Sequence, residues 1–132
     1  MNNSQLFKGL VTSFADPFVV GVPGEPHSCQ VTNRTSDCIY LDCESGEDGG
    51  LQQIFQLEVM STDSDKFIAN LTSRSSPNFI VCSLPPKESF ILVVYAVNSK
   101  GRSKQVALHS STLAGPAKEK GMFKSYDLIF FI

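Results

Sequence analysis

His27 and His109 are the two residues of this 132-residue chain best suited to acid–base chemistry, and many serines accompany them. Catalysis by such groups needs an imidazole within hydrogen-bond reach of a nucleophile or of a substrate proton. His27 precedes the first expected strand and His109 lies in the last one, and neither belongs to a nucleophile or metal-ligand motif. We interpret both as surface side chains and predict that the chain is not an enzyme.

Metal and cofactor motifs are equally weak. Asp63-Ser-Asp65 resembles the start of a calcium loop, but the glycine at the sixth position and the closing glutamate are missing. No Cys-x-x-Cys pair indicates zinc. We therefore expect a solvated turn at this place, no metal and no cofactor.

The four cysteines form two candidate pairs. If residues 29–33 and 38–43 form an antiparallel hairpin, Cys29 lies opposite Cys43, and both side chains share the inward parity. A bridge would close a loop of about 15 residues and add roughly 3 kcal/mol by the chain-entropy estimate. The alternative is two buried free thiols, which pack as small hydrophobes.

Cys38 and Cys82 form the second pair, on the outward parity. Cys38 starts one expected strand and Cys82 ends another, so the two meet if these strands are antiparallel neighbours. A surface bridge and two free thiols both remain open. Disulfides persist in oxidising compartments, and a bridged chain is therefore expected in the secretory pathway.

Three Asn-x-Ser/Thr motifs start at Asn2, Asn33 and Asn70. Asn33 is expected in the turn after the first strand, and Asn70 near an edge strand. Both positions are expected to be exposed, as N-glycosylation requires.

The elements that position these residues are strands. The strongest signal is residues 89–97, an apolar run rich in β-branched and aromatic residues that ends at Asn98 and Gly101. Read at period two, one face holds Phe90, Leu92, Val94 and Ala96, and the other holds Ile91, Val93, Tyr95 and Val97.

Further strands are expected at residues 29–33, 38–43, 53–60, 66–71, 79–83 and 105–109. Seven short strands with turns between them and no helical stretch predict an all-β, seven-stranded antiparallel β-sandwich. We expect a loosely ordered lead at residues 1–22, with a linker signature at 21–26. The domain follows at 23–113, and a C-terminal tail at 114–132.

Residues 128–132 are strongly apolar but far fewer than the roughly 20 residues that span a bilayer. They are either the start of a truncated transmembrane segment or a tail without such a role. The net charge of −2 and the lack of a Lys/Arg cluster argue against nucleic acid as a partner.

Several short segments together have a familiar spacing. They are Pro26-x-x-Cys29, Val31-Thr-Asn33, Cys43-Glu-x-Gly-x-Asp-Gly-Gly-Leu51, Gln53-x-Phe55 and Tyr95-Ala-x-Asn-Ser-Lys-Gly-Arg-Ser103.

This set resembles the membrane-proximal fibronectin type III domain of Sidestep-like proteins, arthropod cell-surface members of the immunoglobulin superfamily. The resemblance covers residues 21–113. It implies a fibronectin type III (immunoglobulin-like) sandwich that is a non-catalytic extracellular module of a single-pass adhesion or axon-guidance protein. It also implies neighbouring immunoglobulin-type domains, and Beaten-path-type receptors as partners through domains absent here, with no small-molecule substrate.

The chain departs from that pattern in a few places. Gln52 stands where a proline is expected, and Cys38 and Cys82 look like additions. The resemblance also puts Cys43 at a position where such domains usually have a core tryptophan. An alternative interpretation is an accessory fibronectin type III module of a secreted enzyme or of another receptor.

One face of the expected sandwich is unusually apolar, and it is our candidate interaction face. Neighbouring apolar residues on adjacent strands would form a contiguous patch, and such patches usually mark contacts. The alternative is that Phe123 or residues 128–132 of the same chain cover this face. Its members are Ile54, Met60, Ile91, Val93 and Tyr95.

Overall fold

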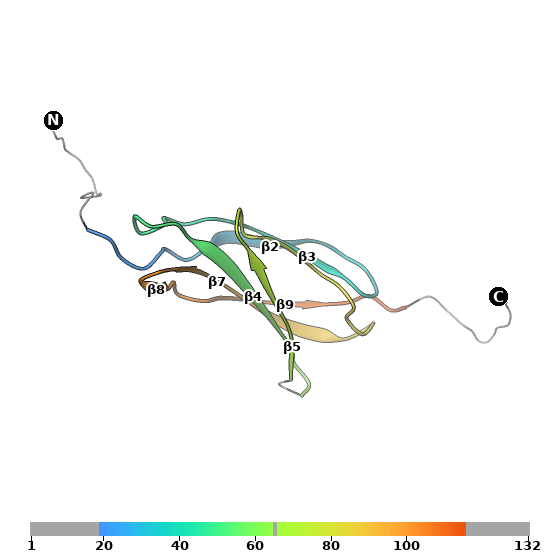
Figure 1. Cartoon of the computed structure of the whole chain (residues 1–132). Coiled ribbons are helices and arrows are strands. Elements are labelled where there is room, and N and C mark those ends of the chain that lie inside the picture. Colours follow the sequence, from blue (N-terminus) through green and yellow to red (C-terminus); the bar gives the residue numbers. More distant parts are fainter. Residues whose placement is uncertain (1–18, 65, 116–132) are drawn as a thin grey trace, which may run out of the picture.

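The computed structural model describes residues 19–64 and 66–115 (Figure 1). Its strands form two antiparallel sheets: a three-stranded sheet in the order β2-β3-β6, and a five-stranded sheet in the order β5-β4-β7-β8, with β9 also paired to β7. The prediction of an all-β sandwich is confirmed. The bounds are β2 His27–Arg34, β3 Ile39–Glu44, β4 Ile54–Ser61, β5 Phe67–Ser73, β6 Asn78–Val81, β7 Ser89–Asn98, β8 Gly101–Arg102 and β9 Val106–Ser111.

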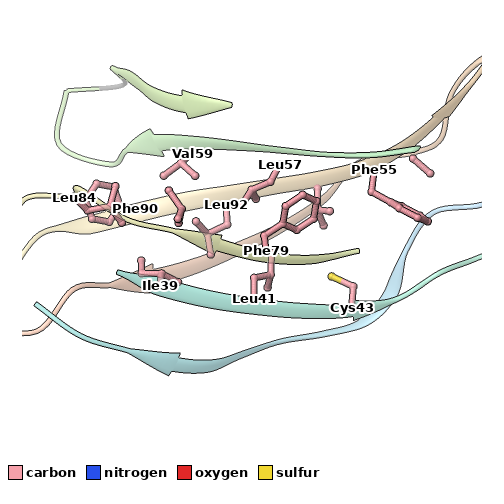
Figure 2. Close-up of a cluster of buried hydrophobic side chains, with 13 residues drawn as sticks. Ile39, Leu41, Cys43, Phe55, Leu57, Val59, Phe79, Leu84, Phe90 and Leu92 are labelled. Carbon is pink, nitrogen blue, oxygen red and sulfur yellow. The ribbon is translucent and has the colours of Figure 1, made fainter. Parts of the chain in front are cut away.

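Alternate residues of each sheet fill the space between the two layers (Figure 2). In β4, for example, the side chains at Phe55, Leu57 and Val59 are buried, whereas Gln56 and Glu58 are partly exposed. Apolar burial of this kind is the main stabilising contribution to such a fold. The buried cluster consists of Ile39, Leu41, Cys43, Phe55, Leu57, Val59, Phe79, Val81, Leu84, Phe90, Leu92, Val94 and Ala96.

Strand β7 lies at the centre of the larger sheet and carries the longest apolar run. Its residues Phe90, Leu92, Val94 and Ala96 are all fully buried in the core. The period-two register predicted for this strand is therefore confirmed. β4 pairs with one edge of β7, and β8 and β9 pair with the other.

The last predicted strand, at residues 105–109, corresponds to β9, and the short strand β8 precedes it on the same edge of β7. Val97 pairs with Arg102, whereas Val94 pairs with Val106, so the partner strand holds one extra residue between the two pairs. Ser103 fills this interruption: its backbone nitrogen donates to the Ala96 carbonyl at 2.8 Å, and its hydroxyl accepts from the Ala96 nitrogen at 2.9 Å. β8 and β9 thus act as one bulged strand, since a bulge inserts one unpaired residue.

The segment expected to be a lead and linker is instead packed against the domain from Gly21 onward. The Gly21 nitrogen donates to the Gly49 carbonyl at 3.0 Å, and the Gly24 nitrogen donates to the Glu47 carbonyl at 2.7 Å. Pro26 is fully buried. The expectation of a loose chain up to residue 22 is corrected for residues 21 and 22, because backbone hydrogen bonds hold this segment to the 46–50 loop.

The described chain begins and ends at opposite poles of the sandwich (Figure 1). Residues 19–22 lie at one pole, beside the 46–50 loop. At the other pole the Leu113 nitrogen donates to the Thr35 carbonyl at 2.9 Å, and the Leu113 carbonyl accepts from the Lys87 nitrogen at 2.9 Å. No helix in the described part is long and apolar enough to cross a membrane. Of the predicted C-terminal tail at 114–132, residues 116–132 lie outside the described part of the chain.

Candidate interaction site

All five residues of the candidate interaction face lie on the outer side of β4 and β7. Met60 stands opposite Ile91, and Ile54 stands opposite Val97. Ile54, Met60 and Ile91 are half-buried, and none of them belongs to the core cluster. The predicted parity of both strands is therefore correct.

Val93 and Tyr95 are not exposed, however, and this corrects the expected patch. Their relative exposures are only 8% and 3%. Val93 lies between Glu58 of β4 and Ala107 of β9, because β7 has paired neighbours on both edges. Long side chains on flanking strands can cover apolar residues with their aliphatic parts while their charged ends stay in water.

Tyr95 is the centre of a small polar cluster on this face. Its Oη donates to Glu58 Oε2 at 2.7 Å, and the Arg102 guanidinium carbon lies 4.7 Å from the centroid of its ring. Burial is the main cause that raises the pKa of Tyr95, followed by the hydrogen bond to Glu58 and its negative charge, while Arg102 acts in the opposite direction. The phenol is therefore a neutral donor that holds Glu58 and Arg102 over the sheet.

This cluster divides the outer face in two. Met60 and Ile91 lie toward one end, and Ile54 and Val97 lie toward the other. A shallow, open depression at the second end is lined by Gln52, Ile54, Arg74, Val97, Asn98 and Ser99. The face is thus a mixed surface with two small apolar areas, not the continuous apolar patch that the strand pattern predicted.

Asn98 connects several segments by hydrogen bonds at the pole where the described chain begins. The sequence analysis identified this residue only as the end of a strand. It is 7% exposed, and its Nδ2 donates to the Gly21 carbonyl at 2.8 Å and to the Asp48 carbonyl at 2.9 Å. Its Oδ1 accepts from the Lys100 nitrogen at 2.8 Å. One amide therefore joins three segments that are distant in sequence.

The glycines of the 46–50 loop permit this close packing. A Cβ on Gly46 would lie 2.6 Å from the Glu25 carbonyl oxygen, and a Cβ on Gly49 would collide with the Gly21 carbonyl oxygen. Gly49 also has a φ of 73°, which favours glycine. The motif that carried the family resemblance at this loop thus has a structural role: it holds the incoming chain.

A disulfide joins Cys29 of β2 to Cys43 of β3, with 4.0 Å between the Cα atoms. Cys43 is 7% exposed within the core cluster, and Cys29 packs against that cluster. The sequence predicted a disulfide between these two cysteines because both face inward on adjacent antiparallel strands, and the structure contains this disulfide.

A second disulfide joins Cys38 to Cys82, with 4.1 Å between the Cα atoms. Ile39 pairs with Val81, so the two cysteines are opposite each other just beyond the paired ends of β3 and β6. Cys82 is exposed. The described residues contain no free cysteine.

Both glycosylation motifs within the described ranges are accessible. Asn33 is exposed, as expected, but it belongs to strand β2, whereas the sequence predicted that it lies in the following turn. Its Oδ1 accepts a hydrogen bond from the Arg34 nitrogen at 2.9 Å. Asn70 is exposed on β5, opposite Glu58. The motif at Asn2 lies outside the described residues.

Both histidines lie at the surface, and His27 Nδ1 is 3.3 Å from the hydroxyl of the adjacent Ser28. His27 Nδ1 lies 3.8 Å from Glu44 Oε1, and both side chains are largely exposed. His109 is exposed on β9. Within residues 19–64 and 66–115 there is no group of three His, Cys, Asp or Glu side chains that would hold a metal ion.

A scan against protein-family models gave no match, and a search of curated proteins gave none either. Solved structures do match. Domains d3–d4 of the rat CD45 extracellular region align with a TM-score of 0.64 at 21% identity, over 70% of this chain and 51% of that chain. Titin domains A168–A170 align with a TM-score of 0.63 at 23% identity, over 71% of this chain and 33% of theirs.

The FN5 domain of Drosophila Lar aligns over its whole length, covering 100% of that chain and 71% of this one, with a TM-score of 0.58 and 20% identity. The fold is that of a fibronectin type III domain. The chain spans about half of the CD45 fragment and about a third of the titin fragment. Fibronectin type III modules of this kind are found in cell-surface receptors and in muscle proteins, and they are typically non-catalytic.

Proposed function

We propose that this fibronectin type III domain is an extracellular spacer and interaction module of a cell-adhesion or axon-guidance protein. The observation that carries the proposal is the geometry of the chain: it enters a disulfide-bonded sandwich at one pole and leaves at the opposite pole (Figure 1). A module of this shape separates the domains on either side of it. The two disulfides favour an oxidising, extracellular environment.

The pole around Asn98 supports the spacer role. Hydrogen bonds fix the backbone at Gly21 and Gly24, so the direction in which the chain enters the domain is set by the domain itself. A preceding domain joined here would be held in a restricted orientation. Under this proposal the neighbour is an immunoglobulin-type domain, and a membrane-spanning segment follows the module.

The resemblance to Sidestep-like proteins supplies the partner class. Immunoglobulin-type domains of such a protein would bind Beaten-path-type receptors, and this module would present those domains at a distance from the membrane. The mixed outer face of β4 and β7 would then contact a neighbouring domain through the areas around Ile54 and Ile91.

A muscle-type role is the competing assignment, because the same fold occurs in titin. Counting free thiols discriminates between the two classes. Protein made through the secretory route should show no reactive thiols after denaturation, since all four cysteines are paired in the structure. Four reactive thiols in the protein isolated from its native tissue would contradict an extracellular role.

The proposal as a whole is tested by the transcript that surrounds this reading frame. We expect immunoglobulin-type domains upstream and a membrane-spanning segment downstream. A catalytic domain in the same transcript would instead support an accessory module of a secreted enzyme.

A further inference from the structure

Strand β5 presents an open edge of the larger sheet. It pairs with β4 on one side, and no other described strand pairs with its other side. From Ala69 to Ser73 it runs opposite Val59 to Phe55 without a break in register, and this stretch holds no charged residue and no proline. Unpaired N–H and C=O groups along such an edge are a template for another strand.

The other sheet edges carry features that hinder strand pairing. β6 has only four residues and β8 only two, and β2 has two irregularities in its register. On β9, Arg34 Nη1 donates to the Ser111 carbonyl at 3.1 Å and to the Ser111 hydroxyl at 2.7 Å, which places a charged side chain over this strand. β5 has one irregularity, near Phe67, and none further along.

The glycosylation motif Asn70-Leu71-Thr72 lies in this regular stretch. Asn70 is exposed, whereas Ala69 and Leu71 on either side of it pack against the core, so the Asn70 side chain points away from the sandwich. The Thr72 hydroxyl donates a hydrogen bond to Gln56 Oε1 at 2.9 Å. Space for a large substituent therefore exists at Asn70 without disturbing the core.

We propose that Asn70 carries an N-linked glycan and that this glycan protects the β5 edge from pairing with another strand, in particular with β5 of a second copy. The Asn70 Nδ2 forms a bond to C1 of a sugar carried on a lipid diphosphate, the C1–O bond to the diphosphate breaks, and the amide loses a proton. The inference rests on the secretory location in the proposed function. A bulky hydrated group at the middle of β5 excludes an approaching strand, as charged residues do on other edges.

The test uses the full chain secreted behind a cleavable leader, with Asn2 replaced by Gln in every variant so that its motif adds no glycan. Asn70→Gln should increase the gel mobility by one glycan and shift the protein in light scattering from monomer toward dimers and larger species. Asn33→Gln is the matched control. It should lose one glycan and stay monomeric, because the register irregularities of β2 already disfavour pairing there. Thr72→Ser keeps the motif and should behave as the wild type.

Enzymatic removal of glycans from folded, secreted protein provides a second measurement that does not depend on the folding of a variant. The proposal expects the wild-type protein to change from monomer to associated species after this treatment. The Asn70→Gln protein, which is already associated and loses only its Asn33 glycan, should show no further change. Unchanged mobility of Asn70→Gln would show that Asn70 carries no glycan. A monomeric Asn70→Gln protein would show that the glycan does not protect the edge. Neither result bears on the domains encoded beside this chain, so the proposed function is tested separately.

Discussion

The two sheets of this domain are stabilised in different ways. Both disulfides belong to the three-stranded sheet, which has a four-residue edge strand in β6 and an edge strand with two irregularities in β2. The five-stranded sheet has no disulfide; it is organised around the ten-residue strand β7, which is paired on both edges. Covalent links thus support the sheet with the shorter ladders, while apolar burial and continuous pairing support the other.

Removing a disulfide from the smaller sheet should have the largest effect. The Cys38–Cys82 bridge spans 44 residues, and its replacement by two serines should reduce the free energy of unfolding by about 4 kcal/mol in the chain-entropy model. The Cys29–Cys43 bridge spans 14 residues, and its replacement by two alanines should cost about 3 kcal/mol. Urea denaturation of the purified variants measures both losses. Equal stability of variant and wild type would show that the smaller sheet does not depend on its cross-links.

A core truncation in β7 tests the larger sheet. Leu92 is fully buried between the layers, so Leu92→Ala should lower the free energy of unfolding by about 3 kcal/mol through lost burial and the resulting cavity. Ile91→Ala, on the outer face of the same strand and half-buried, is the matched control and should lose clearly less. A larger loss at Ile91 than at Leu92 in the same denaturation experiment would contradict the assignment of inner and outer faces.

The polar cluster on the outer face should contribute a smaller amount. Tyr95→Phe removes the hydrogen bond to Glu58 and should cost about 1 kcal/mol. Tyr40→Phe in the smaller sheet is the control, since no hydrogen bond links the Tyr40 hydroxyl to another described residue. If both variants unfold at the same urea concentration as the wild type, the Tyr95 cluster has no part in stability.

The raised pKa of Tyr95 predicts a weak dependence of stability on alkaline pH. Above the ordinary tyrosine pKa, the unfolded chain loses this proton before the folded chain does, so the folded state binds more protons. The contribution of Tyr95 is therefore complete below pH 10.0, the ordinary value, and is lost as the pH rises through the folded pKa. Melting temperatures of wild type and Tyr95→Phe should converge at high pH. If the difference between the two melting temperatures instead increases with pH, the folded state does not raise the pKa of Tyr95.

Much of the framework could be predicted because it depends on local periodicity. The period of two divides this strand into the set Phe90, Leu92, Val94 and Ala96 and the set that contains Ile91, and the first set lies in the core. A shift by one residue would turn every side chain over. The same parity argument placed Cys29 opposite Cys43.

The burial of Val93 and Tyr95 could not be predicted in this way. Parity assigns a residue to a face, but the cover on that face comes from Glu58 and Arg102, which lie on other strands. Only the lateral order of β4, β7 and β8 decides which long side chains reach across.

The sequence by itself determined the fold class, the approximate positions of seven strands and the division of each strand into two faces, because period-two patterns and glycine-rich turns are local properties of the chain. The tertiary structure alone decided that residues 21–26 pack against the 46–50 loop and that Asn98 links both segments. The physical reason is that these relations join backbone groups many residues apart, and no local pattern records which distant segment will be the neighbour.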